Sequence, residues 1–105
     1  MAAEAMPKVQ SLIDESPVVV FSKSYCPYCK STKSTLQKIG IDFKVIELDQ
    51  INGGSDMQDA LEQISGQRTV PNVYIKQKHI GGNSDVQALD KSGKLQGLLK
   101  EAGVV

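Results

Sequence analysis

The sequence has no net charge and no long apolar run. Lysine and arginine number 12, and aspartate and glutamate also number 12. The chain therefore lacks the positive field expected of a protein that binds nucleic acid. No apolar run approaches the roughly 18 residues that a membrane-spanning helix needs. We expect neither a nucleic-acid partner nor a membrane partner.

The first residues lack the features of a targeting segment. Residues 1–7 contain neither the apolar stretch of a secretory signal nor an arginine that would suggest a transit peptide. These absences predict a cytoplasmic location. The length of 105 residues predicts one domain that spans residues 1–105.

Cysteine and histidine are also scarce, with two cysteines and one histidine. Two cysteines in a reducing compartment rarely form a structural disulfide, because the thiols there are kept reduced. Zinc usually takes four ligands, and this chain offers only Cys26, Cys29 and the distant His79. We therefore expect no metal site, and we expect His79 to be a partly exposed strand residue.

Hydrophobic periodicity and turn residues predict alternating helices and strands. The expected helices cover residues 2–16 (with Pro7 in the first turn), 27–39, 56–65 and 84–101, the last interrupted near Gly93. The expected strands cover residues 18–21, 43–48, 73–75 and 79–80, the last two joined by a turn at residues 77–78. This order predicts an α/β, thioredoxin-like fold: a four-stranded mixed sheet with its first two strands parallel, flanked by helices on both faces.

The run Cys26-Pro27-Tyr28-Cys29 lies where the first strand ends and the second helix begins. Residues three apart in the first helical turn share a face and lie within disulfide range. The helix start directs free N–H groups and the positive end of its dipole at Cys26, and Lys23 and Lys30 add charge nearby. Thiolate is thereby favoured, so we expect Cys26 to attack and Cys29 to resolve in thiol–disulfide exchange.

Three runs, in this order, resemble a dithiol glutaredoxin of class I, the CPYC type. They are Ser24–Cys29 (SYCPYC), Arg68–Pro71 (RTVP) and Gly81–Asp85 (GGNSD). The similarity covers essentially residues 8–99. It implies a glutathione-disulfide oxidoreductase that reduces protein–glutathione mixed disulfides and protein disulfides, with glutathione as co-substrate and no tightly bound cofactor. The implied partners are glutathione, glutathionylated or disulfide-containing proteins and, indirectly, glutathione reductase. We expect the chain to be a monomer.

The resemblance also implies which residues bind glutathione. It places a cis proline at Val70-Pro71 opposite the active cysteine, and it assigns the γ-glutamyl end of glutathione to the start of the last helix. The implied contacts are Lys23, Tyr28, Gln58, Arg68, Thr69, Val70, Pro71, Gly82, Asn83, Ser84 and Asp85. Taken alone, Pro71 equally suits the start of a strand, Ser84 and Asp85 suit helix caps, and Gln58 and Arg68 suit a solvated surface.

Two alternatives remain open at this stage. Some glutaredoxins bind an iron–sulfur cluster between two subunits with glutathione, although Pro27 stiffens a turn where those members usually have a smaller residue. Visible absorbance after anaerobic purification would support that carrier function. A thioredoxin is the other alternative, but this chain has no tryptophan, which thioredoxins usually carry before the motif.

Overall fold

Strand β1 (Val18–Ser22) forms the centre of the protein in the computed structural model, which describes residues 2–105. All five of its residues are buried. Because side chains alternate along a strand, Val19 and Phe21 enter the core on one face of the sheet, whereas Val18 and Val20 enter the core on the other. The continuous apolar run therefore predicted a strand covered on both faces correctly.

Three further strands complete the sheet, in the order β2-β1-β3-β4. They are β2 (Lys44–Glu47), β3 (Asn72–Ile75) and β4 (Lys78–Gly81). Strand β1 pairs with β2 in parallel and with β3 antiparallel, and β3 and β4 form a hairpin. The predicted four-stranded mixed sheet is thereby confirmed.

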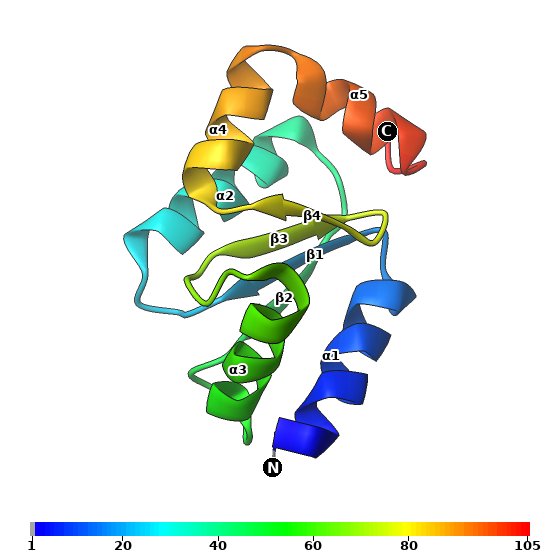
Figure 1. Cartoon of the computed structure of the whole chain (residues 1–105). Coiled ribbons are helices and arrows are strands. Elements are labelled where there is room, and N and C mark those ends of the chain that lie inside the picture. The colour runs from blue at the N-terminus through cyan, green and yellow to red at the C-terminus, as the bar shows by residue number, and fades with distance from the viewer. Residues whose placement is uncertain (1) are drawn as a thin grey trace.

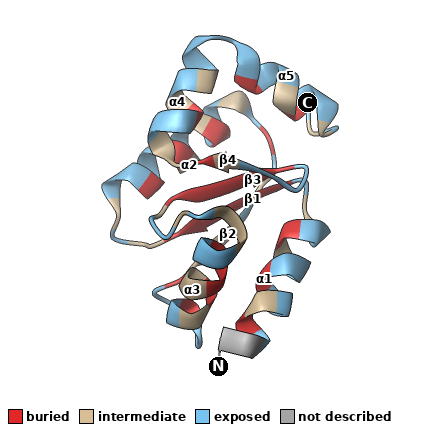
Figure 2. Ribbon diagram, viewed as in Figure 1, coloured by how far each residue is buried: buried red, intermediate tan, exposed pale blue. Residues whose placement is uncertain are grey.

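Within the described residues, five helices cover the two faces of this sheet (Figure 1). On one face lie α1 (Ala2–Glu15) and α3 (Gly54–Ser65). On the other lie α2 (Pro27–Ile39), α4 (Asn83–Lys91) and α5 (Lys94–Glu101). Figure 2 shows the buried residues concentrated on the central strands β1 and β3 and on the helix sides that face them. Across residues 2–105, no helix has the length and apolar character to cross a bilayer.

The second helix has the predicted bounds, because both of its ends carry strong local signals. Pro27 stands at its first turn, and Gly40 ends it in the left-handed conformation (φ 88°). The amide of Gly40 donates to the carbonyls of Gln37 and Leu36, which satisfies helix-end acceptors. Gly93 (φ 81°) likewise separates α4 from α5, as predicted.

Helix α1 begins at Ala2, as predicted, but Pro7 lies inside the helix and not in its first turn. The start of α3 and the last hairpin turn both lie one or two residues earlier than predicted. Helix α3 begins at Gly54, where an added Cβ would lie 1.8 Å from the Leu48 carbonyl oxygen, so only glycine fits there.

The last hairpin turns at Lys76 and Gln77, one residue before the predicted position. Both have positive φ, at 49° and 66°. This two-residue turn matches the twist of the flanking strands. Neither residue is the glycine or asparagine that usually marks such a turn, so no residue type indicates its position.

Candidate active site

Cys26 occupies the N-cap position of α2, in extended conformation (φ −85°, ψ 120°). Its amide donates to the Lys23 carbonyl at 3.0 Å, and its carbonyl accepts the first helical hydrogen bond from the Lys30 amide at 3.1 Å. Because proline has no N–H to lose, Pro27 occupies the first helical position without breaking a hydrogen bond. The chain thus delivers the Cys26 sulfur to the positive end of the helix.

The pKa of Cys26 lies below its ordinary value. Partial burial by itself raises this pKa, but hydrogen bonds from the backbone and the thiol of Cys29 outweigh that effect. The backbone N–H of Tyr28 and the charge of Lys33 lower the pKa further. A larger fraction of Cys26 is therefore thiolate at neutral pH, which makes this sulfur both a better nucleophile and a better leaving group.

Cys29 has the opposite character. Its side chain is fully buried, and this burial raises the pKa of Cys29. Hydrogen bonds from the backbone of Lys23 and the hydroxyl of Ser22 lower the pKa of Cys29 without cancelling that effect. Both cysteines are free thiols. One sulfur of the pair is thus poised to ionise, and the other is held protonated next to it.

Lys33 is the cation that lowers the pKa of Cys26, in place of the predicted Lys23 and Lys30. Lys33 lies one helical turn beyond Lys30, on the side of α2 that faces the sheet, where its ammonium pairs with the Glu47 carboxylate at 2.8 Å. Lys30 is exposed to solvent. Lys23 instead lowers the pKa of Asp49.

Replacing Lys33 with glutamine is expected to raise the pKa of Cys26, because a positive charge that favours the thiolate is lost. At pH values below the pKa of Cys26, the exchange rate of Lys33→Gln should be roughly twofold to fivefold lower than that of the parent. At high pH, where Cys26 is ionised in both proteins, the two rates should converge. Titration of thiolate absorbance and the pH dependence of kcat/KM measure the shift. Lys30→Gln is the matched control on the same helix and should leave the profile almost unchanged. Equal shifts in both variants would contradict the role of Lys33.

The loop before Cys26 is held by Asp49, which follows β2. The Ser24 amide donates to one Asp49 oxygen at 2.9 Å, and the Ser24 hydroxyl donates to the other. These hydrogen bonds lower the pKa of Asp49, so its carboxylate stays charged well into the acid range. The loop that positions Cys26 is thereby tied to the neighbouring strand.

The turn before β3 faces Cys26. The Val70–Pro71 peptide bond is cis, as the family resemblance implies. The Cys26 sulfur lies 4.0 Å from the carbonyl oxygen of Val70, which is a thiol hydrogen bond in the protonated form. Two segments more than forty residues apart in sequence thus meet at the reactive sulfur.

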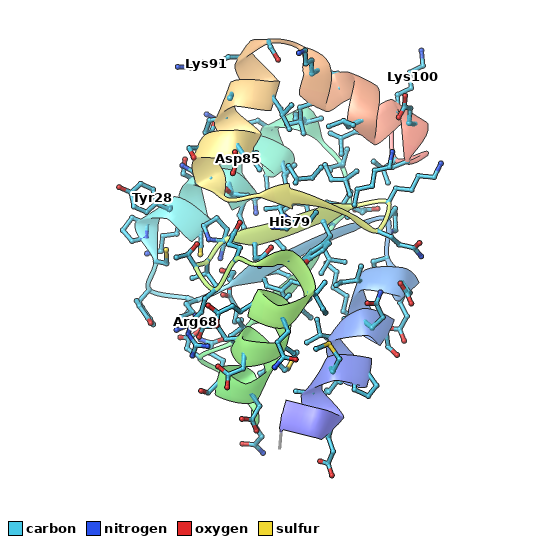
Figure 3. The ribbon with its side chains drawn as sticks, viewed as in Figure 1. Tyr28, Arg68, His79, Asp85, Lys91 and Lys100 are labelled. Atoms are coloured by element: carbon cyan, nitrogen blue, oxygen red, sulfur yellow. The ribbon has the colours of Figure 1, made fainter. Side chains whose placement is uncertain are left out.

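A cavity of about 540 Å³, here termed the Tyr28 cavity, extends from this turn to the start of α4. It is lined by Tyr28, Gln67, Thr69, Val70, Pro71, Gly82, Asn83, Ser84 and Asp85. Eight of these nine residues are among the predicted glutathione contacts, and Gln67 is the one that the sequence did not indicate. Figure 3 shows Tyr28 on α2 and Asp85 on α4 at the same edge of the molecule.

The start of α4 closes one end of the Tyr28 cavity. Gly82 is its N-cap, and the Gly82 amide donates to the Asp85 carboxylate at 2.9 Å. Gly81 has a positive φ of 124°, and a Cβ at this position would lie 2.2 Å from the same carboxylate. Glycine is therefore required for Asp85 to hold its place.

The side chain of Asn83 is engaged with α2. Its Oδ1 accepts from the Thr32 hydroxyl at 2.9 Å and from Nε2 of Gln87 at 3.1 Å. Thr32 is fully buried, one turn beyond Cys29. The Gln87 amide also donates to Thr35 at 2.9 Å. This polar contact ties the helix that carries the thiols to the helix that closes the cavity.

Three predicted contacts do not line the Tyr28 cavity: Lys23, Gln58 and Arg68. Arg68 pairs with Asp59 and, at 3.7 Å, with Glu62, both on α3. Gln58 donates to the Arg68 carbonyl at 2.8 Å. Figure 3 shows Arg68 beside α3, away from Asp85. Only the family resemblance indicated that these three residues contact glutathione. In the structure, acidic residues on α3 hold the Arg68 side chain.

His79 is exposed on β4, more so than predicted, and its ring lies 5.3 Å from that of Tyr74. Partial burial lowers the pKa of His79, and the nearby Asp85 charge opposes that shift.

Among the described residues, no three histidine, cysteine, aspartate or glutamate side chains converge as metal ligands. A larger cavity of about 700 Å³ lies at the opposite end of β1, between Val18 and Val104, and contains no cysteine.

Comparison with known proteins agrees with this geometry. The family model for glutaredoxin matches residues 18–80. A glutaredoxin of Vernicia fordii is 54% identical over 96% of this chain and 97% of its own length. Rice "Glutaredoxin-C4, chloroplastic" is 48% identical over 96% of this chain and 76% of its own. The crystal structure of a buckwheat glutaredoxin–glutathione complex has a TM-score of 0.96 at 45% identity, covering 99% of this chain and 94% of the other.

Proposed function

Because this chain belongs to the glutaredoxin family of glutathione-dependent thiol–disulfide oxidoreductases, we propose that Cys26 is its nucleophile and Cys29 its resolving thiol. The observation that carries the proposal is the contrast within the pair. Cys26 has a lowered pKa and faces the Val70 carbonyl, whereas Cys29 is buried with a raised pKa.

The first half of the reaction removes glutathione from its target. The Cys26 thiolate attacks the glutathione sulfur of a protein–glutathione disulfide, and the target sulfur leaves with the electron pair and takes a proton. Cys26 then carries glutathione as a mixed disulfide. A low pKa helps both steps, since the same sulfur attacks here and leaves in the next half-reaction.

The second half regenerates the thiolate. A second glutathione attacks the bound glutathionyl sulfur, releases oxidised glutathione and leaves Cys26 as a thiolate. The net exchange consumes one glutathione thiol and returns the target as a thiol, so one disulfide is broken and one is formed. With a protein disulfide as substrate, Cys26 forms a mixed disulfide with the protein. Cys29 then attacks the Cys26 sulfur of this mixed disulfide. It releases the reduced protein and leaves an internal disulfide, which glutathione then reduces.

We propose that glutathione occupies the Tyr28 cavity. The buckwheat relative, as its structure is described, is a complex with glutathione. The backbone of Val70 suits the cysteinyl part of the ligand as a short ladder of hydrogen bonds. The free amides at the start of α4 suit its γ-glutamyl carboxylate, and Asp85 suits its ammonium group. Tyr28, Thr69, Pro71, Gly82, Asn83 and Ser84 complete the lining.

The proposed partners are glutathione, glutathionylated proteins and, through oxidised glutathione, glutathione reductase. We propose that the chain works as a monomer in the cytoplasm. Size-exclusion chromatography with light scattering and imaging of the tagged full-length chain test these two points. A stable dimer, or enrichment in plastids, would overturn them.

A reductant-exchange assay tests the function directly. With a glutathionylated peptide as substrate, turnover is expected with glutathione, glutathione reductase and NADPH. Replacing these reductants with thioredoxin reductase and NADPH should lower turnover by at least about a hundredfold, because only glutathione matches the Tyr28 cavity. Equal turnover with both reductants would contradict a glutathione-specific enzyme.

A further inference from the structure

Gln67 lines the Tyr28 cavity from the segment that joins α3 to β3. It is half-buried and belongs to none of the three motifs that the sequence analysis identified. Its side-chain Nε2 lies 3.9 Å from where a Cβ on Gly82 would stand. Gln67 therefore reaches across the cavity from the cis-proline turn toward the start of α4.

Four hydrogen bonds fix Gln67 in this position. Its Nε2 donates to the carbonyl oxygens of Thr69 and Pro71, both at 3.0 Å. Its backbone amide donates to the Ser65 hydroxyl at 3.2 Å, and its carbonyl accepts from Nδ2 of the fully buried Asn72 at 3.3 Å. One residue thereby braces the turn on both sides of the Val70–Pro71 bond.

The bond to Thr69 also sets the direction of a neighbouring group. A peptide unit is planar, and in a trans unit the carbonyl and the following N–H point in opposite directions. Since the Thr69 carbonyl is held toward Gln67, the Val70 N–H is held away from Gln67. The side chain of Gln67 thus determines the orientation of a donor that lies next to the carbonyl facing Cys26.

We propose that Gln67 is a positioning residue that makes the enzyme selective for glutathionyl disulfides. It does so by fixing the Thr69–Val70 peptide so that the Val70 N–H meets the cysteinyl part of glutathione. The inference rests on the proposed function, because it needs glutathione in the Tyr28 cavity. It adds a determinant of selectivity that does not act through the charge on Cys26.

The test compares two disulfides of the same peptide, one blocked by glutathione and one by mercaptoethanol, which has no peptide groups for Val70 to recognise. Since kcat/KM for the disulfide reports the first half-reaction in a ping-pong scheme, it isolates this recognition step. In Gln67→Met, kcat/KM for the glutathionyl peptide should fall about tenfold, which is the cost of a misaligned hydrogen bond. For the mercaptoethanol peptide, kcat/KM should fall less than about twofold. The pKa of Cys26, titrated by thiolate absorbance, should not change.

Gln63→Met, at an exposed position of α3, is the matched control and should leave both values as in the parent. Equal losses for the two peptides in Gln67→Met, or no loss for either, would overturn the positioning role. If Gln67→Met does not fold, Gln67→Leu is judged by the same ratio. A parent enzyme without preference for the glutathionyl peptide would refute the proposed function itself, before any variant is compared.

Discussion

Replacing Cys26 with serine is expected to lower turnover of glutathionylated and protein-disulfide substrates by at least about a thousandfold. In the proposed mechanism, both routes begin with attack by the Cys26 sulfur. A serine hydroxyl at this position is not ionised near neutral pH and forms no disulfide, so no mixed disulfide accumulates. The NADPH-coupled glutathione reductase assay measures the loss, and mass spectrometry of the enzyme after incubation with oxidised glutathione measures the missing adduct.

The fold is expected to survive this substitution, which makes the loss interpretable. Serine is close to cysteine in size, and its hydroxyl is a preferred N-cap acceptor for the N–H groups that otherwise face the Cys26 sulfur. The melting temperature of Cys26→Ser should therefore equal or exceed that of the parent. Appreciable turnover by a correctly folded Cys26→Ser variant would exclude Cys26 as the nucleophile.

Replacing Cys29 with serine should separate the two reactions. Removal of glutathione from a target needs only Cys26, so this rate should stay within about threefold of the parent. Reduction of a protein disulfide needs a second thiol to release the protein, so this rate should fall by about tenfold to a hundredfold. Parallel assays with a glutathionylated peptide and a disulfide-bonded protein measure the two rates.

Serine is the informative replacement at Cys29 because the Cys29 side chain donates a hydrogen bond that lowers the pKa of Cys26. A hydroxyl keeps this donor, whereas Cys29→Ala removes it and should raise the pKa of Cys26. Equal losses of both activities in Cys29→Ser, with an unchanged Cys26 pKa, would contradict the resolving role. The serine and alanine variants together therefore distinguish chemistry at Cys29 from its electrostatic effect.

The thiol pair could be placed from sequence because its signals are local. A strand of β-branched residues, a proline at the first helical position and a glycine cap define α2, and these constraints act over a few residues. The chain therefore positions Cys26 at a helix start whatever the rest of the fold does. The backbone N–H groups of Cys29 and Tyr28, which help to lower the pKa of Cys26, come with that position.

The missed features depend on contacts between distant segments. Lys33 pairs with Glu47 only after β2 lies beside β1. Gln67 gains its place from hydrogen bonds within an irregular turn, which no periodicity reveals. Arg68 has a long side chain, and two acids on α3 determine where its charge lies.

The close approach of Gly81 to the Asp85 carboxylate has a consequence for how the gene tolerates mutation. Much of what the cavity offers a ligand is main chain, and ordinary substitutions leave main-chain groups intact. Damaging mutations should therefore concentrate at a few positions. At the start of α4, proline would delete a backbone amide. At Gly81, any side chain would collide with the Asp85 carboxylate.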